Sequence, residues 1–325
     1  MRHLAIAAVL TAAPAFAGVD DAVNDYLLPH LTEFTQAAEA LNDVAEANCT
    51  AGSVKGAYNA AFDAWTAVSD FRLGPSEHGA LSLSFWPDTR GFTDRSLNGL
   101  IADQDPVVND QAAFEEISIA ARGFFALERL LYDPELSAYE EGTYSCALVR
   151  ALARDIADQA TALEAEWAEF APTLLNPGAE GNTTYLDESE AQRAIYTQIL
   201  SSLEWTQDTR LGRPLGEVDR PRPTRAEAWR SGRSLRQSVL ATVAAVGLAR
   251  ALADWELPET QAALDEVLEQ ADAIDDPSFQ NIDNLMKRLN VEILQQKVDA
   301  LENVIEVEVG TRFGITPGFN SSDGD

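Results

Sequence analysis

The chain has few side chains of the kinds that hold transition metals. Its 325 residues include two cysteines and three histidines. Once an N-terminal leader is removed, His30 and His78 are the only imidazoles, so Cys49 and Cys146 cannot form a zinc site by themselves. In an exported protein an even pair of cysteines favours a disulfide, and we expect one between Cys49 and Cys146.

Positive charge is also scarce. The chain has 23 Lys and Arg against 53 Asp and Glu, a formal net charge of −30. Such a surface repels nucleic-acid phosphates and anionic membranes, so we expect no nucleic-acid partner. We interpret the excess acid first as a means of solubility or salt adaptation, and only second as a way to concentrate cations. The arginine-rich run 220–236 is expected to neutralise neighbouring acidic side chains.

Long hydrophobic runs and common catalytic motifs are missing as well. HExxH, GxSxG, a Gly-rich phosphate loop and a plausible Cys/His nucleophile pair are all absent from the sequence. After the N-terminus no segment reaches eighteen consecutive apolar residues, so we expect no membrane span. These absences argue against the common hydrolase classes and against an integral membrane protein.

The N-terminus has the pattern of an export signal. Residues 1–17 combine a basic start, an apolar run from Leu4 to Leu10 and the cleavage signature Ala15-Phe16-Ala17. No cysteine follows at once, which argues against a lipid anchor. We expect a signal peptide over 1–17 and a periplasmic mature protein.

The remaining sequence is dominated by helical periodicity. Strand signals are nearly absent, and the alternating stretch 304–309 ends a strong helical pattern. The expected fold is all-α, with two related helical bundles of the up-down four-helix type over 18–172 and 189–310. A linker over 173–188 and a tail over 311–325 complete this division.

The expected helices have helical apolar spacing and end at turn-forming residues. They comprise one ending near Cys49, then 54–72, 112–132, 143–170, 188–210, 225–255, 259–273 and 277–308, with a long ordered loop over 73–111 in the first bundle.

A short internal echo supports duplication. Trp65 precedes Arg72-Leu73-Gly74-Pro75, and Trp205 precedes Arg210-Leu211-Gly212-Arg213-Pro214. Both occur where a helix is followed by a loop, so the two bundles are predicted to be related.

The segment 71–91 is expected to build a site. It is long for a connector, and its Trp and Phe argue against disorder because exposed large rings would forgo their burial energy. Arg72, Trp86, Asp88 and Arg90 are candidate ligand-binding residues within it. Trp86 could close the bundle end, with Asp88 capping a turn or pairing with Arg90, or the two could form a wall facing a ligand.

A second candidate group lies in the third expected helix. Gly123 is expected inside this helix, where its cost of about 1 kcal/mol relative to Ala indicates close packing or the approach of a loop. Phe125 and Glu128 are three residues apart and share a face. Glu128 beside an apolar stripe requires an arginine, a hydrogen-bond donor or a metal, and an ion pair is the favoured interpretation. Arg72, Arg90 and Arg122 are the available partners.

A metal site and a contribution from the second bundle complete the expectations. If a metal binds, Glu128, Asp88 and His78 are the best donors, since imidazole with carboxylates suits iron or zinc. Glu217, in the loop 211–224, is expected to face the first site. We therefore expect the site where segment 73–91, the Gly123–Glu128 helix and loop 211–224 meet.

Together these stretches resemble the imelysin-like family, which includes the insulin-cleaving membrane protease and iron-regulated protein A. The likeness is carried by the helix leading to Cys49, FRLGP at 71–75, FWPDTRG at 85–91 and GFFALERLLYD at 123–133, and it spans the mature chain. It implies an exported or lipid-anchored helical protein of two related bundles, with a site between them. It also implies a link to bacterial iron uptake, and some members are classed as metallopeptidases.

One position departs from the family pattern. The family marker is GxHxxE, and here Gly123 and Glu128 match while Phe125 replaces the histidine. A phenyl ring neither ligates a metal nor transfers a proton, so zinc peptidase chemistry is not expected. The predicted function is a non-catalytic component of iron uptake that binds iron, another divalent metal or a small ligand, with envelope iron-uptake proteins as partners. A metallopeptidase and a structural scaffold are the alternatives.

Overall fold

The computed structural model describes residues 18–315, and all of their regular secondary structure is helical. A single isolated β-bridge between Glu217 and Arg220 accompanies the helices in this part of the chain. The all-α prediction is therefore confirmed. The expected signal peptide over 1–17 and most of the expected tail lie outside the described residues.

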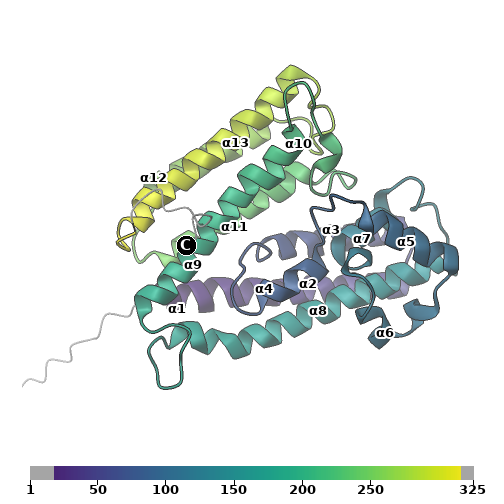
Figure 1. Ribbon diagram of the computed structural model, residues 1–325, viewed down its shortest axis with the longest axis horizontal. Coiled ribbons are helices and arrows are strands. Elements are labelled where there is room, and N and C mark those ends of the chain that lie inside the picture. The colour runs from purple at the N-terminus through teal and green to yellow at the C-terminus, as the bar shows by residue number, and fades with distance from the viewer. Residues whose placement is uncertain (1–17, 316–325) are drawn as a thin grey trace, which may run out of the picture.

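Four helices pack together as the first helix group. Helix α2 lies between α3 and α8, and α7 packs on both α3 and α8 (Figure 1). The aromatic rings of Phe34, Phe62, Trp65 and Phe124 form its centre, each at most 1% exposed. The helices of this group are α2 (Leu28–Ala47), α3 (Ala51–Thr66), α7 (Gly123–Tyr132) and α8 (Tyr144–Leu175).

The connection from α3 to α7 differs from the expected irregular loop. It contains short helices: α4 (Ser76–Leu83), α5 (Phe92–Asp103), η2 (Pro106–Asn109), α6 (Gln111–Glu115) and η3 (Ile119–Ala121).

Two expected helices of this half are shorter than the periodicity indicated. The helix expected over 54–72 ends at Thr66. The helix expected over 112–132 is interrupted after α6, where the Ser118 side chain accepts the Ala120 N–H and starts a separate turn. The Ser118 side-chain cap competes with a continuous helix, and hydrophobic spacing does not reveal it.

The second helix group follows in the chain. Helix α9 packs on α11 and α13, and α12 packs on α11 and α13 (Figure 1). Its elements are α9 (Glu188–Trp205), η4 (Thr206–Gly212), α10 (Arg213–Leu215), η5 (Pro223–Arg225), α11 (Ser234–Leu252), α12 (Pro258–Asp272), α13 (Leu285–Ile305) and η6 (Glu306–Gly310).

The boundaries of this group follow capping more closely than apolar spacing. Asp187 accepts the Glu190 N–H at the start of α9, while the Glu190 carboxylate accepts the Leu186 N–H. The helix expected from residue 277 begins at Leu285 because Asn284 caps it. The helix expected from 225 begins at Ser234. The stretch 304–309 is helical, as predicted.

The two helix groups meet along α11 and the N-terminal helices. The short α1 (Val19–Asp21) and η1 (Ala22–Leu27) lead into α2 and also contact α11. By length and composition α11 is the one helix among residues 18–315 that is apolar enough to cross a membrane. However, 56% of that apolar window is buried in the fold, and a core helix passes the same test.

A disulfide joins Cys49 to Cys146, as predicted, with their Cα atoms 5.3 Å apart. Both residues are fully buried. The bond connects the end of α2 to the first turn of α8, so it fastens the two longest helices of the first helix group.

Candidate functional site

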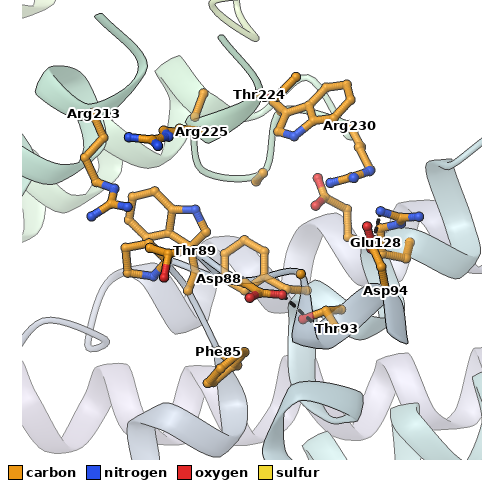
Figure 2. A pocket seen from close by; sticks show the side chains of 18 residues that line it. Phe85, Asp88, Thr89, Thr93, Asp94, Glu128, Arg213, Thr224, Arg225 and Arg230 are labelled. Atoms are coloured by element: carbon orange, nitrogen blue, oxygen red, sulfur yellow. Dashed lines mark hydrogen bonds and ion pairs between the residues drawn. The ribbon is translucent and has the colours of Figure 1, made fainter. Parts of the chain in front are cut away.

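A cavity of about 310 Å³ lies where the two helix groups meet, and we call it the junction cavity. The first helix group contributes segment 85–94 and helix α7, and the second contributes Arg213 and segment 224–230. Figure 2 shows Arg213 and Arg225 on one side, with Glu128, Asp94 and Arg230 on the other and Asp88 and Thr93 below. This is the meeting place of segments that the sequence motifs indicated.

Gly123 brings segment 82–88 against α7. It is the first residue of α7, not an interior one as expected, and its φ is +70°. A Cβ atom there would lie 2.5 Å from the Ser82 carbonyl oxygen and closer still to that of Leu83. Only glycine permits both this backbone conformation and this approach, so the predicted close packing of a loop is confirmed.

The rings of Trp86 and Phe125 form part of the wall of the junction cavity. Trp86 stacks on Phe125 with ring centroids 6.3 Å apart and 23° between planes, and it meets Trp205 edge-on at 6.2 Å. Phe125 is 8% exposed and also meets Phe62 edge-on. The position of the family histidine thus lies in the wall of the cavity and contributes an apolar surface.

Glu128 is buried at the opposite end of the same helix face. Its carboxylate accepts hydrogen bonds from the Ser231 N–H at 2.9 Å and the Ser231 hydroxyl at 2.6 Å. The ion pair expected for Glu128 is therefore absent among the described residues, and Ser231 supplies hydrogen bonds in its place. Arg122, one of the expected partners, pairs with Asp155. Burial raises the pKa of Glu128, opposed by the Ser231 bonds and by the charges of two nearby arginines.

Asp88 precedes helix α5 and accepts a hydrogen bond from its first turn. Its oxygens accept the backbone N–H of Thr93 at 2.8 Å and of Arg90 at 3.2 Å. Partial burial acts to raise the pKa of Asp88, but these backbone hydrogen bonds outweigh it and leave the pKa below its usual value. The capping interpretation is confirmed, and Asp88 also lines the cavity. Arg90 meets it through the main chain and not through its guanidinium.

A second, smaller cavity lies behind Trp86, and we call it the Arg210 cavity. Arg72 borders it together with a buried charge cluster of Asp70, Arg210 and Glu227. Burial acts to raise the pKa of Asp70, but the Arg210 guanidinium outweighs this and lowers it. Arg72 is thus separated from the junction cavity by Trp86, which lines both cavities.

Three predicted residues lie elsewhere. Arg90 is exposed, and its carbonyl accepts from Arg95. His78 is exposed on α4 and Glu217 is exposed in a turn, and neither lines the junction cavity. The predicted metal donors Glu128, Asp88 and His78 are therefore not brought together. Across residues 18–315 no three His, Cys, Asp or Glu side chains cluster closely enough to hold a metal ion.

The donor set at the junction cavity does not fit zinc. Glu128 already satisfies one oxygen with two Ser231 hydrogen bonds, and its neighbour on the helix face is a phenyl ring. A structural or catalytic zinc requires at least three protein ligands.

From the second helix group the sequence indicated loop 211–224 and Glu217, but not the side chains that line the cavity. Arg213, Arg225, Trp229 and Arg230 line the junction cavity, and Ser231 holds Glu128. Part of the arginine-rich run does neutralise acids, as expected: Arg233 and Arg236 pair with Asp63, and Arg230 pairs with Asp133. Its combination of arginines with Trp229 was the available signal for a binding wall.

The fold and the cavity define an all-helical protein with a ligand-sized site between two helix groups. The sequence profile of the imelysin family, described as peptidase M75, matches residues 27–305, so the chain belongs to the imelysin family. An imelysin-like protein from Psychrobacter arcticum 273-4 has a similar crystal structure, with a TM-score of 0.76 and 16% sequence identity. The match covers 93% of this chain and 96% of that one. The comparison with curated proteins gave no match.

Proposed function

We propose that this protein is a periplasmic, non-catalytic member of the imelysin family that binds a small ligand in the service of bacterial iron uptake. The observation that carries the proposal is the junction cavity, formed jointly by both helix groups, with Phe125 at the marker position. A cavity of about 310 Å³ is at the lower end of the size of small-molecule sites. The N-terminal export pattern supports the periplasmic location.

The cavity is suited to binding rather than to hydrolysis. Trp86 and Phe125 supply an apolar surface, and the charged groups around it are mostly held by neighbours. Peptide hydrolysis requires an activated water and a group that stabilises the oxyanion. Neither a three-donor metal set nor a histidine lies at this cavity, so iron itself would arrive as part of a complex.

The first test measures growth when iron is limiting. A strain that lacks the protein is expected to grow slowly when iron is limiting, and the wild-type chain should restore growth. A Trp86→Ala/Glu128→Gln variant should fail to restore it, whereas Glu269→Gln, an exposed change on α12, should succeed. Equal restoration by both variants would contradict a role for the junction cavity.

The metallopeptidase alternative makes a different prediction. Wild-type protein incubated with zinc, iron or copper should cleave an unfolded protein substrate, and a chelator should stop the cleavage. We expect no cleavage with any of these metals. Chelator-sensitive cleavage that Glu128→Gln abolishes would replace the binding proposal with the peptidase.

A scaffold role is the remaining alternative, with envelope iron-uptake proteins as the assembled partners. In that case Trp86→Ala/Glu128→Gln should lower the free energy of unfolding without changing the binding of any small molecule. Pull-down of envelope proteins with the wild-type chain and with this variant separates the scaffold role from the ligand-binding role. A scaffold would retain its partner proteins only while it is folded.

We also infer that the two helix groups are related halves. Trp65 with Arg72 and Trp205 with Arg210, the residues of the repeated pattern, border the same Arg210 cavity from opposite groups. Superposition of residues 18–172 on 189–310 should align the helix that ends at each tryptophan; an alignment with the helices in a different order would contradict the duplication.

A further inference from the structure

Two arginines of the junction cavity have no acidic partner. Four arginines line it, and two of them form ion pairs, Arg129 with Asp94 and Asp133, and Arg230 with Asp133. Among residues 18–315 no ion pair involves Arg213 or Arg225.

This arrangement is unusual for so acidic a chain. With 53 Asp and Glu against 23 Lys and Arg, a carboxylate partner is available for nearly every arginine. Yet Arg213 and Arg225 lie on the same side of the cavity (Figure 2). Burial, and then the charge of Arg225, lowers the pKa of Arg213. Two like charges held together favour an anion between them.

Arg213 also offers a donor that the protein does not use. Its Nε is buried and has no hydrogen-bond acceptor, and the same is true of the Nε of Arg129, which lines the cavity from helix α7. Buried donors are usually satisfied, so both favour a ligand rich in acceptor oxygens. The planar guanidinium matches carboxylate and phosphate groups with two parallel hydrogen bonds.

The backbone beneath Arg213 is fixed. The buried guanidinium of Arg288 donates to the carbonyls of Leu215 at 2.6 Å and Gly216 at 3.1 Å. The Arg222 N–H also donates to the Pro214 carbonyl at 2.8 Å. Because these hydrogen bonds already order the wall, the protein would lose less conformational entropy when a ligand binds to it.

The acidic residues of the cavity do not cancel this positive side. Asp94 is paired with Arg129, Asp88 is held by backbone N–H groups, and Glu128 is held by Ser231. Figure 2 shows Glu128 and Asp94 on the side away from Arg213 and Arg225. The charge is therefore divided across the cavity, with its unpaired positive groups at one end.

We propose that the junction cavity binds a small oxyanion, a polycarboxylate or a phosphate-bearing molecule, through Arg213 and Arg225, with Trp86 and Trp229 forming the apolar walls. The cavity volume restricts the ligand to a small molecule. The inference rests on the proposed function in that it concerns the same cavity, but it does not require that the ligand carry iron.

Calorimetric titration of the purified protein with citrate, with inorganic phosphate and with glycerol tests the proposal. We expect saturable binding of citrate or phosphate, weakened by added salt, and none of the neutral glycerol. The better of the two anions identifies the ligand as a carboxylate or a phosphate. An Arg213→Met/Arg225→Met variant should bind at least about 30-fold more weakly, since it loses two charge-assisted contacts.

The control is Arg220→Met, which removes one positive charge from an exposed residue of loop 211–224 outside the cavity wall. The affinity of this variant for the anion should lie within about twofold of the wild-type affinity, because solvent and salt screen an exposed charge outside the cavity wall. Thermal unfolding of each variant checks the fold. Binding unchanged in the double variant, or no binding of either anion, would overturn the proposal.

A titration with ferric citrate separates this inference from the iron role. If free citrate binds and ferric citrate does not, the oxyanion site stands and the iron role fails. If ferric citrate binds equally well to wild type and to the double variant, the iron role stands and the oxyanion site at Arg213 and Arg225 is wrong.

Discussion

Arg210 of the second helix group holds both carboxylate oxygens of Asp70 in the first, with Nη1–Oδ2 and Nη2–Oδ1 distances of 2.7 and 2.9 Å. Its Nε bonds to Glu227 at 2.7 Å. The side chains of Arg210 and Asp70 are 3% and 7% exposed. One guanidinium therefore compensates two buried carboxylates and connects the two helix groups directly behind the junction cavity.

Loss of this guanidinium should be costly. Arg210→Met leaves Asp70 and Glu227 buried without their partner, and we expect the free energy of unfolding to fall by about 3–5 kcal/mol. Urea denaturation measures the change. The control Arg236→Met breaks a pair with Asp63 whose arginine is 56% exposed and should cost less than about 1 kcal/mol. Equal losses in both variants would show that burial of the pair is unimportant.

Two glycines should respond in opposite directions to the same change. Gly123→Ala places a Cβ into the backbone of segment 82–83 at a positive φ, and we expect a loss of at least about 3 kcal/mol. Gly56→Ala lies at an exposed position of helix α3 with nothing within 4 Å of the added atom, so it should raise stability by about 0.5–1 kcal/mol. Thermal unfolding compares the two. A tolerated Gly123→Ala would mean that segment 82–83 moves freely.

Stability should depend on pH through Glu302. Burial, reinforced by neighbouring acidic residues and opposed by a hydrogen bond from Gln207, raises its pKa from 4.5 to about 7. A raised pKa means that the folded state binds the proton of Glu302 more tightly than the unfolded state does. The contribution of this proton to the stability of the fold is therefore complete below pH 4.5 and is lost as the pH rises through 7.

The test is urea denaturation at pH 5 and pH 8. Between these values wild type should lose about 1–2 kcal/mol more than Glu302→Gln, a range reduced because the carboxyl is partly exposed. Glu269→Gln, an exposed change on α12, should retain the wild-type pH dependence. The same slope in all three proteins would exclude Glu302 as its source.

The disulfide should be a main source of stability in the first helix group. Cys49 and Cys146 are 97 residues apart, and closing a loop of that length restricts the unfolded chain. We expect Cys49→Ala/Cys146→Ala to lower the free energy of unfolding by about 2–5 kcal/mol. Reductant should destabilise wild type and leave the double variant unchanged. An effect of reductant on the double variant would point to another cause.

Much of the helical architecture could be predicted from local patterns. Apolar spacing identified the long helices because each buries one face, and it correctly kept 304–309 helical. Helix ends were less predictable, since they depend on caps such as Asn284 and on the left-handed backbone of Gly123. The helices within 73–111 were missed because short helices carry few turns of periodicity.

In the candidate site the sequence indicated cavity-lining side chains only for the first helix group, and for the second it indicated loop 211–224 without Arg213. Trp86, Asp88 and Glu128 belong to motifs that mark a site by their residue types, and all three line the junction cavity. His78, on helix α4, and Glu217, in a turn, lie away from it, because residue type alone does not determine which way a side chain faces.

By itself the sequence determined the helical class, the cysteine pair and the absence of the marker histidine, since each depends on residue identity or on spacing along the chain. The tertiary structure decided that Ser231 holds Glu128, that Arg210 pairs with Asp70 and that Arg213 and Arg225 share one wall without an acid. Ser231 and Glu128, like Arg210 and Asp70, are more than 100 residues apart in the chain. Arg213 and Arg225 stand out because they have no ion pair among residues 18–315, which spacing along the chain does not reveal. Such relationships arise only when the packing of two helix groups brings distant side chains together and excludes water from between them.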